Sequence, residues 1–176
     1  LVLMARTADT GNKGISTFVV PSDTPGVSYG SDLAKLGWHS QPTKEIHFDA
    51  ARVPLAARLG EEGDGFRIAM RGLDGGRINI AACSVGTAQA ALQAAGDYMN
   101  ERHQFGQPLA SFQALQFKLA DMATDLTAAR QMVYLAADKL DTGHPDATTY
   151  CAMAKRFATD AGFRVCNEAL QIHGGY

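Results

Sequence analysis

The chain has 176 residues, of which 46% are hydrophobic and 19% are charged, and its formal net charge is −2. This composition is typical of a globular domain. The absence of a basic block argues against nucleic acid as a main partner, and no apolar run approaches the roughly 20 residues that a membrane-spanning helix requires. Cys83, Cys151 and Cys166 lie far apart without a CxxC spacing. We therefore expect buried thiols in a reducing compartment, and neither a disulfide framework nor a zinc site.

Residues 1–60 have the pattern of short β-strands. Leu1–Arg6 is largely apolar, Ile15–Val20 is β-branched and aromatic, and Lys44–Asp49 alternates between polar and apolar side chains. Turn-forming residues separate these segments, and no helical pattern intervenes. Strands joined in this way pair antiparallel, but so few of them do not close a core. We expect this stretch to be part of a larger antiparallel β domain.

The pattern becomes helical after Gly60. Asp64, in the glycine-rich segment GEEGDGF, stands where a helix N-cap is expected, and Asp146 can cap a later helix. Apolar residues recur every three or four positions from about residue 66 to 99, from about 115 to 140, and up to about 172. The sequence thus predicts an α+β chain in which residues 61–176 form an antiparallel bundle of long, alanine-rich helices. The expected core positions are Phe66, Met70, Leu73, Ile80, Ser84 and Ala88 in the first helix, Leu115, Leu119, Met122, Leu126, Ala129, Val133, Ala136 and Leu140 in the second, and Met153, Phe157 and Val165 in the third.

A polar segment, ERHQFGQPLASFQ, lies between the first two helical patterns and belongs to neither. Arg102 and Gln113 supply hydrogen-bond donors near its two ends, and Phe105 and Phe112 supply aromatic faces. One interpretation is a plain connector with a Gly-Gln-Pro turn, because most segments between helices only connect them. The other is a site that binds an anionic ligand between two rigid helices.

Arg77 is unusual because it falls on the apolar stripe of the first helix, where a charge needs a partner. Asp74 lies three residues earlier and can supply one. The pair is either an ordinary intrahelical ion pair or the rim of a ligand groove. Gly75 and Gly76, with Gly72, favour the groove, because a glycine inside a helix costs about 1 kcal/mol relative to alanine and bares the backbone to a ligand.

The third helical pattern is followed by QIHGGY, which ends the chain. Paired glycines after a helix usually form its C-cap, although backbone exposed at such a turn can also approach a ligand. His173 alone is more often structural than catalytic. The glycines of GEEGDGF do not fit the GxGxxG frame of a dinucleotide-binding fold, and the sequence has no serine nucleophile elbow, HExxH motif or P-loop.

Five collinear segments resemble the acyl-CoA dehydrogenase family. GISTFVVPSDTPGV and LGWHSQPTKEIHFDAARVP resemble its β domain, and GEEGDGFRIAMRGLDGGRINIAACSVG resembles the first helix of its C-terminal helical domain. RHQFGQPLASFQALQFKLADMATDLTAAR resembles its flavin-binding loop and second helix, and QIHGGY a second flavin-binding segment. The likeness is strongest to the isobutyryl-CoA dehydrogenase branch. It implies that residues 1–60 are the C-terminal part of the central β domain, and residues 61–176 most of a C-terminal helical bundle domain.

The resemblance implies FAD as the cofactor and α,β-desaturation of a short or branched-chain acyl-CoA thioester as the reaction, with electrons passed to an electron-transferring flavoprotein. Arg102 would meet the FAD pyrophosphate, Phe105 would pack beside the adenosine portion, and Phe112 and Gln113 fall at flavin-contacting positions. The remaining implied contacts are Gln171, Ile172, His173, Gly174 and Gly175 with the FAD of a neighbouring subunit, and Asp74, Gly75, Gly76 and Arg77 with the CoA part of the substrate.

The resemblance places no catalytic base in this chain. Some family members carry it immediately before the arginine that matches Arg77, where this chain has Gly76, and others carry a glutamate beyond Tyr176. Asp74 and Glu168 are carboxylates that nothing in the sequence places beside a substrate α-carbon. We therefore expect the 176-residue chain alone to have no dehydrogenase activity.

The ends of the chain look internal, because it begins in a strand-like run without an initiator methionine and stops directly after a helical pattern. We expect a piece of a longer protein that forms a homotetramer in the bacterial cytoplasm or the mitochondrial matrix. Two other interpretations remain open: an oxidase-like flavoenzyme that reoxidises its flavin with oxygen, and a non-catalytic helical binding or scaffold protein on the same fold.

Overall fold

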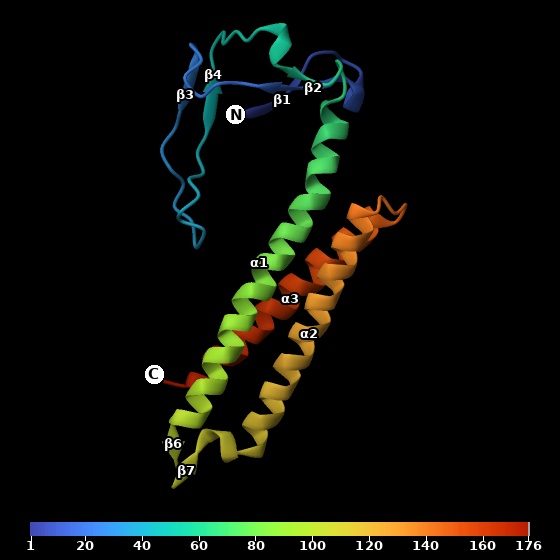
Figure 1. The fold of residues 1–176 in the computed structure, drawn as a ribbon. Helices are drawn as coiled ribbons and strands as arrows, with labels where there is room; N and C mark the ends of the chain where they lie inside the picture. The colour runs from blue at the N-terminus through green and yellow to red at the C-terminus, as the bar shows by residue number, and fades with distance from the viewer. Residues whose placement is uncertain (176) are drawn as a thin grey trace. The chain divides into compact units, whose positions relative to one another are not determined.

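The computed structural model describes residues 1–175 of the chain (Figure 1). Two compact units, Leu1–Met70 and Arg71–Tyr176, divide it inside the first long helix. The boundary after residue 60 that the sequence indicates stays a prediction. Among the described residues, no helix is both long enough and apolar enough to cross a membrane.

Antiparallel strands form the first unit, as the sequence predicts. Its elements are β1 (Val2–Arg6), the 3₁₀ helix η1 (Gly11–Gly14), β2 (Ile15–Val19), β3 (Val27–Tyr29), β4 (Ile46–Phe48), the 3₁₀ helix η2 (Leu55–Ala57) and β5 (Arg58–Leu59). β2 lies between β1 and β5 in a three-stranded sheet, and β3 pairs separately with β4. The three predicted strands are β1, β2 and β4. The sequence did not predict β3 and β5, because a strand of two or three residues is too short to show an alternation of polar and apolar side chains.

The glycines of GEEGDGF allow this segment to pack closely on η1 and β2. A Cβ on Gly63 would lie 2.4 Å from the Lys13 carbonyl oxygen, and one on Gly65 would lie 2.7 Å from that of Ile15. The Gly63 N–H donates to the buried Ser16 hydroxyl at 3.0 Å. Side chains at these two positions would clash with the backbone of η1 and β2, so glycine has a structural explanation here.

Asp64 begins the first helix differently from the predicted N-cap. Its carbonyl accepts the first helical bond from Ile68, but its carboxylate accepts from the Arg67 guanidinium at 2.8 Å and from the Glu61 N–H at 3.1 Å. The pKa of the Asp64 carboxyl is lowered, mainly by the hydrogen bond from Arg67 and to a smaller extent by the bond from the Glu61 N–H. The same ion pair raises the pKa of Arg67. The carboxylate therefore fastens the turn before the helix and does not cap the N–H groups after it.

The second unit is a bundle of three helices, α1 (Gly65–Glu101), α2 (Gln113–Asp141) and α3 (Ala147–His173). They run antiparallel in sequence order, and their bounds agree with the predicted ones within a few residues (Figure 1). Asp146 occupies the predicted N-cap position of α3, although its side chain makes no capping hydrogen bond. The short strands β6 (His103–Gln104) and β7 (Gln107–Pro108) and the 3₁₀ helix η3 (Leu109–Ser111) join α1 to α2.

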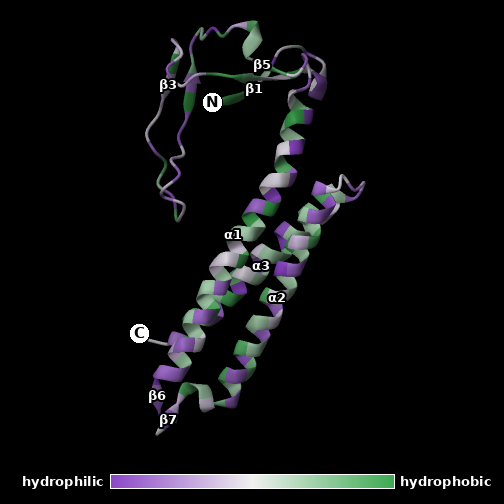
Figure 2. Ribbon diagram, in the orientation of Figure 1, coloured by the Kyte–Doolittle hydropathy of each residue, from purple (hydrophilic) through white to green (hydrophobic). Residues whose placement is uncertain are grey.

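Alanine dominates the interior of the bundle. Ala81, Ala88 and Ala95 recur at every seventh residue of α1 and are completely buried. Small side chains at this spacing let the other two helices approach closely. Figure 2 shows hydrophobic and hydrophilic residues interleaved along all three helices, as in amphipathic helices. The predicted stripe of α2 is confirmed at its centre, where the buried residues are Met122, Leu126, Ala129, Val133 and Ala136.

The core face of α1 differs from the predicted stripe. Of the predicted positions only Ala88 is buried, whereas Leu73 and Ile80 are 46% and 41% exposed. The prediction followed the larger apolar residues, but the helices pack along the alanine face, where smaller side chains permit the closer approach. The larger apolar residues, such as Leu73 and Ile80, therefore lie outside the packed face of α1.

Two expectations about other residues are also corrected. On α3 Val165 is buried as predicted, but Met153 is 45% exposed. Of the three thiols only Cys151 is fully buried, and Cys83 is exposed. Burial raises the pKa of the Cys151 thiol, and the nearby charge of Asp74 raises it further, so this thiol stays neutral.

Candidate functional site

The polar segment between α1 and α2 folds into a tight hairpin. His103 pairs with Pro108 and Gln104 with Gln107, so the turn consists of the two residues between them. These are Phe105 and Gly106, whose φ angles are 56° and 81°. Two successive positive φ angles are the geometry of a type I′ hairpin turn. The chain therefore reverses at Phe-Gly and not at the expected Gly-Gln-Pro sequence.

Phe105 occupies this turn at an energetic cost. A residue other than glycine in the left-handed region is strained by roughly 1–2 kcal/mol, and the Phe105 ring is 91% exposed. The Phe112 ring meets it edge-on, with centroids 6.1 Å apart and planes at 79°. A strained backbone that holds an aromatic ring in solvent is characteristic of functional sites, and the ring offers an apolar face to a ligand.

The donor side chains around the hairpin are available to a ligand. Arg102 and Gln113 are exposed, and neither side chain has a hydrogen-bond or ion-pair partner within residues 1–175. The backbone beneath them is fixed, because the Arg102 N–H donates to the Tyr98 carbonyl and the Arg102 carbonyl accepts from Leu109, both at 2.8 Å. A guanidinium and an amide on a fixed backbone suit an anionic group.

The C-terminal end of α3 reaches the same end of the bundle. His173 stacks on Tyr98, in the last turn of α1, with ring centroids 4.5 Å apart and planes at 25°. His173 Nδ1 lies 2.8 Å from the Ala169 carbonyl oxygen. A carbonyl oxygen only accepts, so the Nδ1–H group of His173 is the donor in this hydrogen bond.

A groove of about 340 Å³ opens beside His173. The Ile172 side chain is buried in the core of the bundle, whereas Gln171 and the glycines after it are exposed. Burial raises the pKa of the Cys166 thiol. The groove is lined by Ala91, Ala94, Cys166, Ala169, Leu170, His173 and Gly174.

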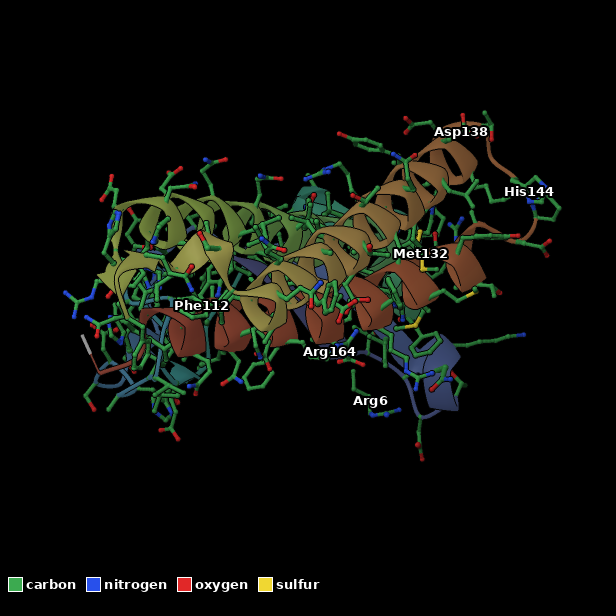
Figure 3. All side chains as sticks on the ribbon, turned by 90° about the horizontal axis from the view of Figure 1, so that it is seen from below. Arg6, Phe112, Met132, Asp138, His144 and Arg164 are labelled. Atoms are coloured by element: carbon green, nitrogen blue, oxygen red, sulfur yellow. The ribbon has the colours of Figure 1, made fainter. Side chains whose placement is uncertain are left out.

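The Tyr98–His173 contact brings together two residues that lie 75 positions apart in the sequence. In Figure 1 the β6–β7 hairpin and the end of α3 lie at the same end of the bundle. Figure 3 follows the length of α2 from Phe112 to Asp138, with His144 in the connection to α3 at the far end. All residues that the resemblance assigns to FAD are therefore gathered at one end.

Asp74 and Arg77 form the expected ion pair, close to the first turn of α3. Arg77 Nη1 donates to Asp74 Oδ1 at 2.5 Å, and Thr148 Oγ1 donates to Asp74 Oδ2 at 2.7 Å. Both oxygens of the carboxylate are thus engaged, and its side chain is only 14% exposed. Nothing else in the described chain binds the Arg77 guanidinium, so its remaining N–H groups are free to meet a ligand.

The glycines around this ion pair have no packing explanation within the described chain. A Cβ on Gly72, Gly75 or Gly76 would meet no atom within 4 Å. On α3, by contrast, a Cβ on Gly162 would lie 3.1 Å from the Ser84 carbonyl oxygen. Gly162 is therefore required by helix packing, whereas the three glycines of α1 leave an open strip of backbone that a ligand or another chain can approach.

The two groups of candidate residues lie far apart on one chain. Arg77 precedes Glu101, the last residue of α1, by 24 positions, which corresponds to roughly 36 Å along a helix that rises 1.5 Å per residue. The structure thus collects the predicted FAD contacts at one end and the predicted substrate contacts toward the other. No side chain spans that distance, so the two groups do not share one pocket within a single chain.

The carboxylates that could have served as a base are both engaged. Asp74 accepts hydrogen bonds from Arg77 and Thr148. Glu168 forms an ion pair with Lys118 between α3 and α2. Arg164, labelled in Figure 3, pairs with Asp125 at 3.0 Å along the same pair of helices. These two ion pairs flank a groove of about 460 Å³. No cluster of metal-binding side chains occurs in the part of the chain that the structure describes.

Two residues of the site were missed by sequence reasoning. Tyr98 stacks on His173, and Thr148 binds Asp74 from 74 positions away. Tyr98 carried a weak signal, because it lies one helical turn before Arg102. Thr148 carried none, because a threonine at the start of a helix has many local uses.

The comparisons with known proteins agree on one family. The family model described as "Acyl-CoA dehydrogenase, C-terminal domain" matches residues 63–176. Bovine mitochondrial isobutyryl-CoA dehydrogenase is 54% identical over 175 residues, which cover 99% of this chain and 42% of that protein.

Two solved structures have the same fold as this chain. Butyryl-CoA dehydrogenase from Megasphaera elsdenii matches with a TM-score of 0.96 at 48% identity, over 99% of this chain and 46% of that one. A structure of PigA with FAD and proline matches with a TM-score of 0.93 at 30% identity, over 99% and 45% of the two chains. The α+β fold with a helical bundle is thereby confirmed. The chain spans less than half the length of each of these relatives.

Proposed function

Because the chain belongs to the acyl-CoA dehydrogenase family, we propose that the complete protein is an FAD-dependent enzyme that desaturates a short or branched-chain acyl-CoA thioester between Cα and Cβ. The observation that carries this proposal is the Tyr98–His173 stack, which joins the end of α3 to the last turn of α1, directly before the hairpin. It gathers exposed donors and an exposed aromatic ring at one end of the bundle, from two segments that resemble flavin-binding segments.

These residues suit FAD. The pyrophosphate calls for a guanidinium, which Arg102 supplies, and Gln113 adds an amide donor for the cofactor. The Phe105 ring, held in solvent by its strained turn, offers a face to the adenosine portion. Bound FAD would supply the oxidant that accepts two electrons from the substrate. The chain itself binds and orients it.

The CoA part of the substrate is assigned to the other group of residues. Arg77 presents a guanidinium that Asp74 holds in place, which suits an anionic group. The open glycine strip around it lets a ligand lie against the helix backbone. Neither residue touches the reacting carbon atoms in this assignment. They position the substrate.

The separation of the two groups favours a cofactor bound between subunits. Roughly 36 Å of helix divides Arg77 from the hairpin end of α1. The FAD held at the hairpin end of one subunit therefore meets the substrate end of another. This arrangement requires an oligomer, and we propose a homotetramer, in keeping with exposed apolar side chains such as Phe163 and Leu170, which are 75% and 71% exposed in the single chain.

The base that removes the α-proton is assigned to none of the described residues. Gly76 has no side chain to act as one, and the carboxylates of Asp74 and Glu168 are bound by Thr148 and Lys118. The resemblance implies a glutamate outside residues 1–176 as the base, and we propose that the complete protein carries it there. We further propose electron-transferring flavoprotein as the electron acceptor, and the bacterial cytoplasm or mitochondrial matrix as the compartment.

The proposal is tested with the purified full-length protein. It should be yellow with a flavin spectrum, contain about one FAD per subunit, and be bleached by isobutyryl-CoA or butyryl-CoA in the absence of air. Colourless protein that neither binds FAD nor reduces a dye with any short acyl-CoA would refute the proposal and favour a scaffold protein on this fold.

A further inference from the structure

Thr148 makes the one side-chain hydrogen bond that joins the first turn of α3 to the Asp74–Arg77 pair on α1, within the described residues. Its hydroxyl donates to Asp74 Oδ2 at 2.7 Å, while Arg77 Nη1 donates to Asp74 Oδ1 at 2.5 Å. The carboxylate thus links two helices, and the two donors occupy its opposite oxygens.

Fixing both oxygens fixes the orientation of the carboxylate. A carboxylate bound at one oxygen can still rotate about its terminal bond, whose torsional preference is broad. Bound at both, it holds its plane and with it the direction of the Arg77 guanidinium. This matters because arginine has a long side chain with many rotamers, and a fixed partner reduces the number that it populates before a ligand arrives.

We infer that Thr148 is a positioning residue for substrate binding: it orients Asp74, and through Asp74 it presents the Arg77 guanidinium to the anionic CoA portion of the substrate. The inference rests on the proposed function of the Asp74–Arg77 pair. It extends that site to a second helix and gives the start of α3 a part in substrate affinity. Thr148 itself touches neither the reacting atoms nor the cofactor.

The neighbourhood of Asp74 offers no competing explanation for the contact. Cys151, one turn further along α3, is neutral because burial raises the pKa of its thiol. It therefore adds no negative charge that would repel the Asp74 carboxylate and dictate its position. Thr149, the next residue on α3, is exposed and its side chain binds nothing within residues 1–175, so a threonine at the start of this helix does not itself require a partner.

The test replaces Thr148 by valine in the full-length enzyme with FAD bound. Valine keeps the β-branched shape and removes only the hydroxyl. KM for the acyl-CoA should rise about three- to tenfold, the effect of losing one ordinary hydrogen bond that acts on the ligand only through Asp74 and Arg77, while kcat stays within about twofold. Thr148→Ser should restore the wild-type KM, because serine keeps the hydroxyl. Thr149→Val, the matched control, should leave both constants unchanged.

Other results would overturn the inference. An unchanged KM in Thr148→Val, a fall in kcat at constant KM, or failure of Thr148→Ser to restore affinity would each do so. Loss of FAD or of helical content in Thr148→Val would assign the residue a purely structural role.

Arg77→Ala, measured in parallel, separates the inference from the proposed function. If Arg77→Ala raises KM and Thr148→Val does not, only the inference fails. If Arg77→Ala also leaves KM unchanged, the assignment of the pair to CoA fails with it.

Discussion

The His173 imidazole stacks on the Tyr98 ring with centroids 4.5 Å apart, and this contact ties the last turn of α3 to the last turn of α1. Tyr98 directly precedes the segment proposed to bind FAD, and His173 lies in the second such segment. We therefore expect the contact to stabilise the bundle, and this structural role can be measured separately from the proposed binding of FAD.

A double-mutant cycle measures the structural role. Combining Tyr98→Leu with His173→Ala should give a coupling energy of about 0.5–1.5 kcal/mol in the unfolding free energy, the usual contribution of a stacked aromatic pair. Chemical denaturation of the full-length protein supplies the four values. A coupling indistinguishable from zero would mean that the two rings do not interact in solution.

Substitutions of Phe105 should affect the stability of the protein and its affinity for FAD in different ways. Phe105→Gly relieves the left-handed strain, whereas Phe105→Ala keeps it, so the glycine variant should be more stable than the alanine variant by about 1 kcal/mol. Both remove the exposed ring and should weaken FAD binding equally, by about tenfold. Thermal denaturation and flavin titration are the measurements. Equal stability of the two variants would contradict the turn geometry, and unchanged FAD affinity would contradict the role of the ring.

The glycine strip of α1 makes a similar prediction. Gly76→Ala should stabilise the protein by about 0.5–1 kcal/mol, because alanine is the better helix former and its Cβ meets no atom within 4 Å. The same change should weaken acyl-CoA binding, since a methyl group now stands on the open backbone.

Two matched variants control this experiment. Gly86→Ala, also on α1 with no atom within 4 Å of its Cβ, should stabilise without affecting acyl-CoA binding. Gly162→Ala should destabilise, because its Cβ would lie 3.1 Å from the Ser84 carbonyl oxygen. If Gly76→Ala leaves the acyl-CoA dissociation constant unchanged, the strip is not a substrate surface.

Asp64 predicts an acid-sensitive contribution to stability. Its pKa in the folded chain is lowered from the ordinary value of 3.8, chiefly by Arg67. A lowered folded pKa means that the carboxylate stabilises the fold above its unfolded pKa, and that this contribution is lost as pH falls through the lower folded value. Wild-type protein should therefore lose more stability than Asp64→Asn as the pH falls below 3.8. Thermal denaturation at a series of pH values measures the loss. Equal loss of stability in the two proteins would contradict the assignment.

Much of the helical unit could be predicted from its sequence because its signals are local. The 4,3 spacing of apolar residues along α2 gave its buried stripe directly, and the glycine pair after α3 marked its end. For α1 the same reasoning chose the wrong face. The face that packs is made of alanines such as Ala81 and Ala95. Because alanine is only weakly hydrophobic, the sequence pattern does not indicate that these residues are buried.

The candidate site was predictable in its residues but not in its contacts. Arg102, Phe105 and Arg77 stand out by composition and by resemblance. The positive φ of Phe105, the stacking of Tyr98 on His173 and the Thr148 hydrogen bond to Asp74 depend on how separate helices meet. Contacts between elements far apart in the chain have no local signature, so only the structure reveals them.

The central claim is that the hairpin end of the bundle holds FAD, and Arg102→Ala in the full-length protein tests it most directly. The dissociation constant for FAD should rise at least about tenfold, since a guanidinium bound to pyrophosphate is a charge-assisted contact, while circular dichroism shows unchanged helical content. Arg156→Ala, an exposed arginine of α3 whose side chain has no partner within residues 1–175, is the matched control and should bind FAD as the wild type does. An Arg102→Ala protein with wild-type FAD affinity would contradict the account and return the segment to a plain connector.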